Sequence, residues 1–101
     1  MSTYSIKEIT EKVTPIFSSN SVKRAILFGS YAKGTQTYAS DIDILVESDI
    51  KMKGIDFFGL LDDITETLGV SIDLIDSSQL IEGGRLQLET QRTGVVIYEK
   101  S

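Results

Sequence analysis

Apolar residues recur along the chain with two different spacings, and these spacings predict its secondary structure. In two stretches the apolar positions are three or four residues apart, which is the spacing of one face of a helix. Elsewhere short and nearly continuous apolar runs indicate buried strands. The pattern predicts helices over residues 5–18 and 55–68, and strands over residues 22–28, 42–47 and 70–75.

The first predicted helix carries a start signal and an internal proline. Ser5 and Glu8 have the spacing of a capping box, in which each side chain bonds the backbone amide of the other residue. Pro15 has no backbone N–H to donate, so we expect it to bend the helix or to break it locally. Gly69 is a suitable residue to end the second helix, and residues 48–53 form a polar connection before it.

Residues 78–99 are ambiguous in the sequence. Leucine and isoleucine positions between 80 and 88 would line a helix, but Gly83 and Gly84 disfavour one. Residues 85–99 would also suit a hairpin that turns at residues 92–94. Periodicity alone leaves both alternatives open.

Composition and charge restrict the chemistry that the chain can support. The 101 residues include one proline and no long Gly/Ser tract, so we expect a single domain over residues 1–101. Cysteine and histidine are absent, so acid–base or metal chemistry must rest mostly on Asp and Glu. The net charge of −5 argues against a broad nucleic-acid surface but not against a metal-bound nucleotide. Without a signal peptide or a long apolar run, a cytoplasmic protein with no membrane span is expected.

A turn of small residues follows the first predicted strand. Gly29 permits a sharp turn and a close approach of a ligand to the backbone. Ser30 could cap a short helix over residues 31–33, whose first amides would suit a phosphate. Because the link from Ser30 to Asp41 is short, we expect the two flanking strands to be antiparallel neighbours, with Gly29 beside Asp41.

Two carboxylates open the second predicted strand. Asp41 and Asp43 are two positions apart, so they point to the same face of the strand, about 7 Å from each other. Two acids on one face repel each other unless a cation lies between them. Carboxylate oxygens with a phosphate nearby suit Mg²⁺ better than zinc or copper.

These residues together resemble a known signature. Gly29-Ser30, ten further residues and then Asp41-x-Asp43 are similar to the motif of DNA polymerase β-type nucleotidyltransferases. The longer string GSYAKG…SDIDILV resembles their smallest branch, the minimal nucleotidyltransferases (MNT). The resemblance implies a mixed α/β fold in which helices pack on a small mixed β-sheet. It also favours a helix within residues 78–93, followed by a short strand at residues 95–98.

The resemblance implies roles for particular residues. Asp41, Asp43 and Asp73 would be the catalytic carboxylates and would hold two Mg²⁺ ions. Gly29, Ser30 and Lys33 would bind the triphosphate of ATP or another NTP, although the family more often has Arg at the position of Lys33, whose ammonium lacks the planar fork. Asp73 interrupts an apolar run and matches the third family carboxylate by position. The rival, Asp76, fits better as a cap of the following segment.

The resemblance also implies a reaction and a partner. Such an enzyme would move an NMP to a hydroxyl group, and the expected donor is ATP, which would supply AMP. Because the predicted elements use the whole sequence, we expect the acceptor to bind an exposed face, a second copy or a partner protein. The resemblance implies a HEPN-type toxin whose tyrosine is modified, so that the chain acts as an antitoxin. The alternative is a non-catalytic binding module that neutralises its partner by complex formation. Formation of a homodimer is a further possibility.

Overall fold

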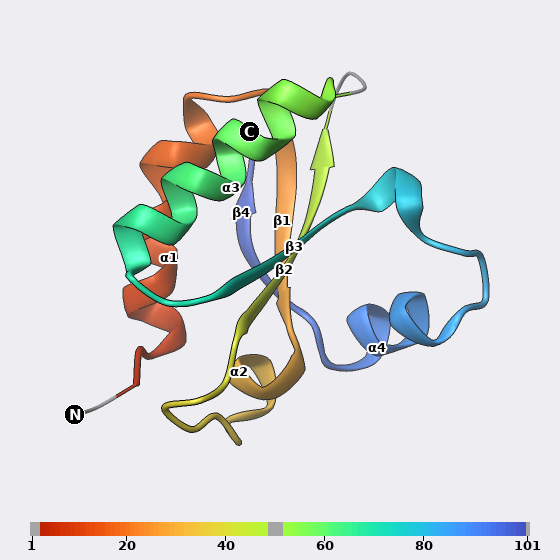
Figure 1. Cartoon of the computed structure of the whole chain (residues 1–101). Helices are drawn as coiled ribbons and strands as arrows, with labels where there is room; N and C mark the ends of the chain where they lie inside the picture. Colours follow the sequence, from red (N-terminus) through yellow and green to blue (C-terminus); the bar gives the residue numbers. More distant parts are fainter. Residues whose placement is uncertain (1–2, 49–51, 101) are drawn as a thin grey trace.

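The computed structural model describes residues 3–48 and 52–100 and shows a mixed α/β fold (Figure 1). Helices and strands alternate along most of the chain. In chain order the elements are α1 (Ile6–Ser18), β1 (Val22–Phe28), α2 (Gly29–Lys33), β2 (Ile42–Ser48), α3 (Gly54–Leu68), β3 (Ile72–Asp76), the 3-10 turn η1 (Ser77–Gln79), α4 (Arg85–Thr93) and β4 (Val95–Glu99).

The four strands form one mixed sheet in the order β3-β2-β1-β4. β1 pairs antiparallel with both β2 and β4, whereas β2 and β3 are parallel. The mixed sheet and the antiparallel pairing of the first two strands confirm the sequence-based expectation. The register places Phe28 opposite Asp43, and Asp43 opposite Asp73.

The hydrophobic core lies between one face of the sheet and the helices α1 and α3. Side chains alternate between the two faces of a strand, and the positions that face these helices are buried. The second face of the sheet carries Arg24, Asp43 and Glu47. The buried core residues are Ile9, Val13, Phe17, Val22, Ala25, Leu27, Tyr31, Ile42, Ile44, Val46, Leu60, Ile64, Leu68, Leu74 and Ile97.

Helix α1 begins as predicted and does not break at its proline. The amide of Glu8 donates to Ser5 Oγ at 3.1 Å, and the amide of Ser5 donates to Glu8 Oε1 at 2.9 Å. The helix continues through Pro15 to residue 18, so the local break expected there is wrong. Val13 and Phe17 are fully buried on either side of the proline, and their packing stabilises the last turn despite the missing hydrogen bond.

Helix α3 ends as predicted but presents part of its apolar sequence to solvent. Gly69 adopts the left-handed conformation with φ +68°, which suits a helix-ending glycine. Ile55 and Phe58 mark the predicted helix, yet they are 81% and 67% exposed. The polar connection expected over residues 48–53 lies partly outside the described residues, because residues 49–51 are not among them.

The ambiguous region forms a helix followed by a strand, α4 and β4, and not a hairpin. The helix begins only after Gly84, while Gly83 adopts φ +74° in the preceding turn. The two glycines therefore lie outside the helix that they would destabilise. None of the helices in the described ranges combines the length and apolarity that a membrane span requires.

Candidate functional site

The three predicted carboxylates lie near one another at one end of the second face of the sheet. Asp43 on β2 pairs in register with Asp73 on the parallel strand β3, and residues in register point to the same face. Asp41 immediately precedes β2, two positions before Asp43. Asp41 and Asp73 are exposed, whereas Asp43 is half-buried. The fold therefore brings together acids that are far apart in the sequence.

Asp73 is less enclosed than its sequence context suggests. β3 is an edge strand, so the apolar run around Asp73 borders only one neighbouring strand. The expectation that Asp73 interrupts a buried strand is wrong, because its side chain is exposed. Asp76 behaves as expected: its Oδ1 accepts a hydrogen bond of 3.0 Å from the amide of Ser78 and caps η1.

A fourth carboxylate, Glu89 of α4, belongs to the same region and was not predicted. Its charge acts on Asp43, and its Oε1 lies 3.2 Å from Lys33 Nζ at the end of α2. The glutamate is outside the signature and within the region that the sequence left ambiguous. Glu89 could have been placed in the site only if the sequence had shown that residues 85–93 form a helix.

The neighbouring acids change the ionisation of Asp43. Burial of its carboxyl group and the charges of Asp73, Asp41 and Glu89 raise the pKa of Asp43 to about 6. A hydrogen bond to Asp73 acts in the same direction. The ionised form of Asp43 is therefore disfavoured first by burial and then by the surrounding negative charge.

Gly29 lies directly against Asp43. Its φ of +72° is in the left-handed region, and a Cβ built at this position would lie 3.0 Å from Asp43 Cγ and closer still to Oδ2. Gly29 was expected beside Asp41; the register places Phe28 opposite Asp43, and the carboxylate that the glycine contacts is that of Asp43. The position requires glycine for both its backbone conformation and its contact.

Ser30 does not cap the short helix after β1. α2 begins at Gly29, and its N-cap residue is Phe28, which makes no side-chain capping bond. Ser30 is the second residue of the helix, so the predicted cap is wrong although the short helix is confirmed. The helix therefore begins two residues earlier than predicted, at Gly29, whose positive φ turns the chain.

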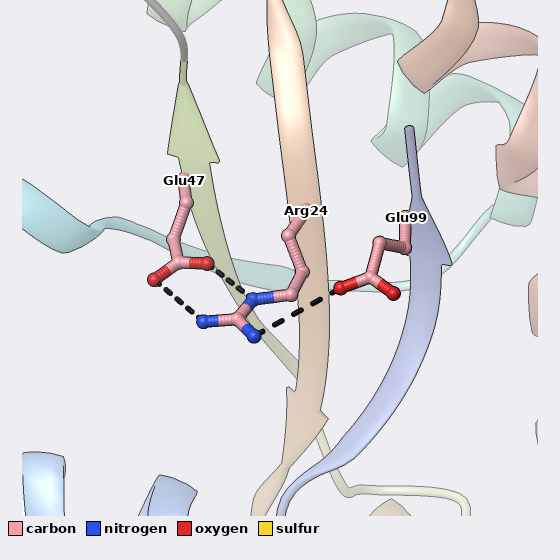
Figure 2. Close-up of polar contacts among 3 residues, drawn as sticks. All are labelled: Arg24, Glu47 and Glu99. Atoms are coloured by element: carbon pink, nitrogen blue, oxygen red, sulfur yellow. Dashed lines mark hydrogen bonds and ion pairs between the residues drawn. The ribbon is translucent and has the colours of Figure 1, made fainter. Parts of the chain in front are cut away.

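A separate charged cluster lies farther along the second face of the sheet. Figure 2 shows Arg24 of β1 between Glu47 of β2 and Glu99 of β4. Arg24 Nε donates to Glu47 Oε2, Arg24 Nη2 donates to Glu47 Oε1 at 3.0 Å, and Arg24 Nη1 lies 3.9 Å from Glu99 Oε2. The guanidinium group therefore connects three strands through its ion pairs with Glu47 and Glu99.

The donor set suits Mg²⁺ better than other metals. Hard carboxylate oxygens are its preferred ligands, and a cation would offset the negative charges that, after burial, raise the pKa of Asp43. Within residues 3–48 and 52–100, no three acidic side chains converge closely enough to form a preformed metal-binding group. The assignment of two Mg²⁺ ions to Asp41, Asp43 and Asp73 stays a prediction.

Comparison with known sequences gives consistent matches. The family described as "Polymerase beta, Nucleotidyltransferase" matches residues 11–101. A Methanocaldococcus jannaschii protein named as a protein adenylyltransferase is 43% identical over 70 residues, which are 69% of this chain and 75% of the relative. Another protein of that organism with the same kind of name is 40% identical over 78 residues, which are 74% of this chain and 78% of the relative.

Solved structures support the same assignment. The structure of a toxin–antitoxin with AMP-PNP has a TM-score of 0.78 and 26% identity, and the match covers 91% of this chain and 74% of that one. A tri-AMPylated Shewanella oneidensis HEPN toxin in complex with its MNT antitoxin gives a TM-score of 0.73 at 21% identity, over 94% and 73% of the two chains, and supports the fold alone. The chain thus belongs to the polymerase β-type nucleotidyltransferase family.

Proposed function

We propose that this nucleotidyltransferase uses Mg²⁺ and ATP to transfer AMP to a tyrosine hydroxyl of a HEPN-type toxin, and that it thereby acts as an antitoxin. The observation that supports this best is that Asp43 contacts Gly29 and lies close to Asp41 and Asp73. The names of the relatives indicate which group is transferred and to what kind of acceptor. The relatives are named as protein adenylyltransferases, and the structural neighbours include an AMP-PNP complex and an AMPylated toxin.

The geometry suggests a different task for each residue. Gly29 carries no side chain where the backbone meets Asp43, so a phosphate group could approach both. Ser30 and Lys33, which follow on α2, would contact the triphosphate. Asp41 and Asp43 would hold Mg²⁺ together with Asp73. When bound, Mg²⁺ would neutralise the phosphate charge and lower the pKa of the attacking hydroxyl group.

Asp73 is the carboxylate best placed to serve the acceptor. It is exposed on an edge strand, so a hydroxyl group of another protein can reach it from solvent. In the proposed reaction the hydroxyl oxygen bonds the α-phosphorus of ATP, and the bond from that phosphorus to the bridging oxygen breaks. Pyrophosphate leaves, and the hydroxyl proton passes to Asp73. Positioning of the acceptor can contribute several kcal/mol to such a reaction, and a bound partner protein would provide it.

The proposed function is tested with the protein that co-purifies from the native host. Mass spectrometry of the co-expressed pair should show that the partner gains one or a few AMP units, and peptide mapping should place them on tyrosine. The gain should disappear when Asp41 and Asp43 are both replaced by Asn. Neutralisation of an unmodified partner would instead favour the non-catalytic binding module. Efficient transfer to a free sugar, drug or RNA end by this chain alone would contradict the proposal.

The exposed edge strand gives a second prediction, which concerns the choice between two aspartates. Asp73→Asn should reduce the transfer rate by about 100-fold or more, the usual range for loss of a proton acceptor. Asp76→Asn should change the rate much less, because Asp76 caps η1. Because Asn caps a helix about as well as Asp does, the free energy of unfolding of this variant should stay close to that of wild type. Transfer assays and thermal unfolding of both variants measure these effects, and the reverse ranking of rates would contradict the assignment.

A further inference from the structure

An ion pair connects the signature segment to helix α4. Lys33 is the last residue of α2, and its Nζ lies 3.2 Å from Glu89 Oε1. The side chains are 46% and 30% exposed, so the pair is partly shielded from water. α2 and α4 are far apart in the sequence, and this pair is a charged contact between them.

Glu89 also belongs to the electrostatic surroundings of the proposed catalytic acids. Its charge, together with those of Asp41 and Asp73, disfavours ionisation of Asp43. A carboxylate at this position opposes a triphosphate because it occupies the ammonium group of Lys33. A lysine ammonium is a compact point charge on a flexible stem, so movement toward a phosphate increases its distance from Glu89 and weakens that attraction.

We propose that Glu89 is a latch on Lys33, which holds the ammonium group until a triphosphate displaces the carboxylate. This inference rests on the proposed function, because it assumes that the triphosphate binds beside α2. Glu89 is then a positioning residue that acts through Lys33. Nucleotide binding would exchange a contact with α4 for a contact with phosphate, and would break this charged contact between α2 and α4.

The test compares MgATP binding by the wild-type chain and by Glu89→Gln. The variant keeps the size of the side chain and removes its charge. An exposed or partly exposed ion pair is worth little free energy, so we expect the dissociation constant to fall by about two- to fivefold. Inorganic tripolyphosphate should show the same preference for the variant, because the effect depends on the phosphates. The KM for ATP should fall by a similar factor, with a smaller change in kcat.

Two further variants separate the latch from a general effect of charge. In the Lys33→Met background, Glu89→Gln should no longer tighten MgATP binding, since the two residues act as one unit. Glu66 is an exposed residue of α3, a helix that packs on the other face of the sheet. Glu66→Gln makes the same charge change there and should leave the dissociation constant unchanged. Tm is recorded for every variant to show that the fold is intact.

Each outcome either supports or overturns the latch. Unchanged or weaker MgATP binding by Glu89→Gln would overturn it, as would tightening that persists without Lys33, which would indicate direct repulsion of phosphate. These results would leave the proposed transfer activity intact. If the wild-type chain bound neither MgATP nor tripolyphosphate, the proposed function and the latch would both be overturned.

Discussion

Replacing Asp43 by Asn is expected to abolish AMP transfer and at the same time to stabilise the fold. Asp43 lies between Gly29 and Asp73 and is the most buried of the three proposed metal-binding acids. Its loss should lower the transfer rate by at least about 100-fold, because stabilisation of charge in the transition state is worth several kcal/mol. The rate is measured with α-labelled ATP and the bound partner, and wild-type transfer by the variant would show that Asp43 is not a metal ligand.

The stabilisation follows from the sign of the pKa shift. Folding raises the pKa of Asp43 from 3.8 to about 6, so the folded chain binds this proton more tightly than the unfolded chain does. Its contribution therefore favours folding at low pH and is lost as the pH rises through about 6. A shift of roughly two units corresponds to nearly 3 kcal/mol, but the side chain is only half-buried. After discounting for solvent screening we expect about 1 kcal/mol.

Unfolding by denaturant measures this effect. At pH 7 without metal, Asp43→Asn should have the higher free energy of unfolding, and the difference should shrink as the pH falls toward 4. Mg²⁺ should stabilise the wild-type chain more than the variant, because a bound cation relieves the same repulsion. Asp62→Asn, at an exposed position of α3, is the matched control for the change of charge. A variant that is less stable than wild type at every pH would contradict the proposed repulsion at Asp43.

A single methyl group at Gly29 is expected to disable the site. Gly29→Ala would place a Cβ into Asp43 and would force a residue with φ +72°. Gly34 provides a matched control, since its φ of +76° is similar but nothing lies within 4 Å of its Cβ position. Gly34→Ala should cost about 1 kcal/mol of stability from the backbone conformation alone. Gly29→Ala should cost about 2–4 kcal/mol, because the contact with Asp43 must also shift.

Nucleotide affinity provides the second measurement of this prediction. If the proposed phosphate region includes Gly29, MgATP binding by Gly29→Ala should weaken by more than about tenfold, because the added methyl displaces Asp43. The affinity of Gly34→Ala should stay close to that of wild type. Equal affinities of the two variants would show that the close approach at Gly29 is unrelated to the nucleotide.

Local patterns were sufficient to predict most of the fold. The capping box of α1, the apolar strands, the glycine that ends α3 and the spacing of the signature each depend on residues close together in the sequence. For the same reason Asp41 and Asp43 could be assigned to one face from β-strand geometry alone. The position of Asp73 came from the family resemblance, and the strand register then placed it beside Asp43.

What could not be predicted depends on contacts between distant segments. The meeting of Gly29 with Asp43 follows from the register of β1 and β2, and the exposure of Asp73 follows from the place of β3 at the sheet edge. Glu89 enters the site only because α4 packs near α2. The continuity of α1 through Pro15 depends on core packing that outweighs a local preference. Helical periodicity likewise could not show that Phe58 would face solvent.

The order of the strands also bears on how the site assembles during folding. β1 and β2 are joined only by α2 and one loop, so their pairing closes a short stretch of chain and loses little conformational entropy. This pairing brings Gly29 to Asp43. Asp73 arrives only after the chain has crossed over through α3 to form the parallel pair, which is an intrinsically slower step. The two halves of the site therefore differ in kinetic origin: one forms from local contacts, and the other waits for a long-range encounter.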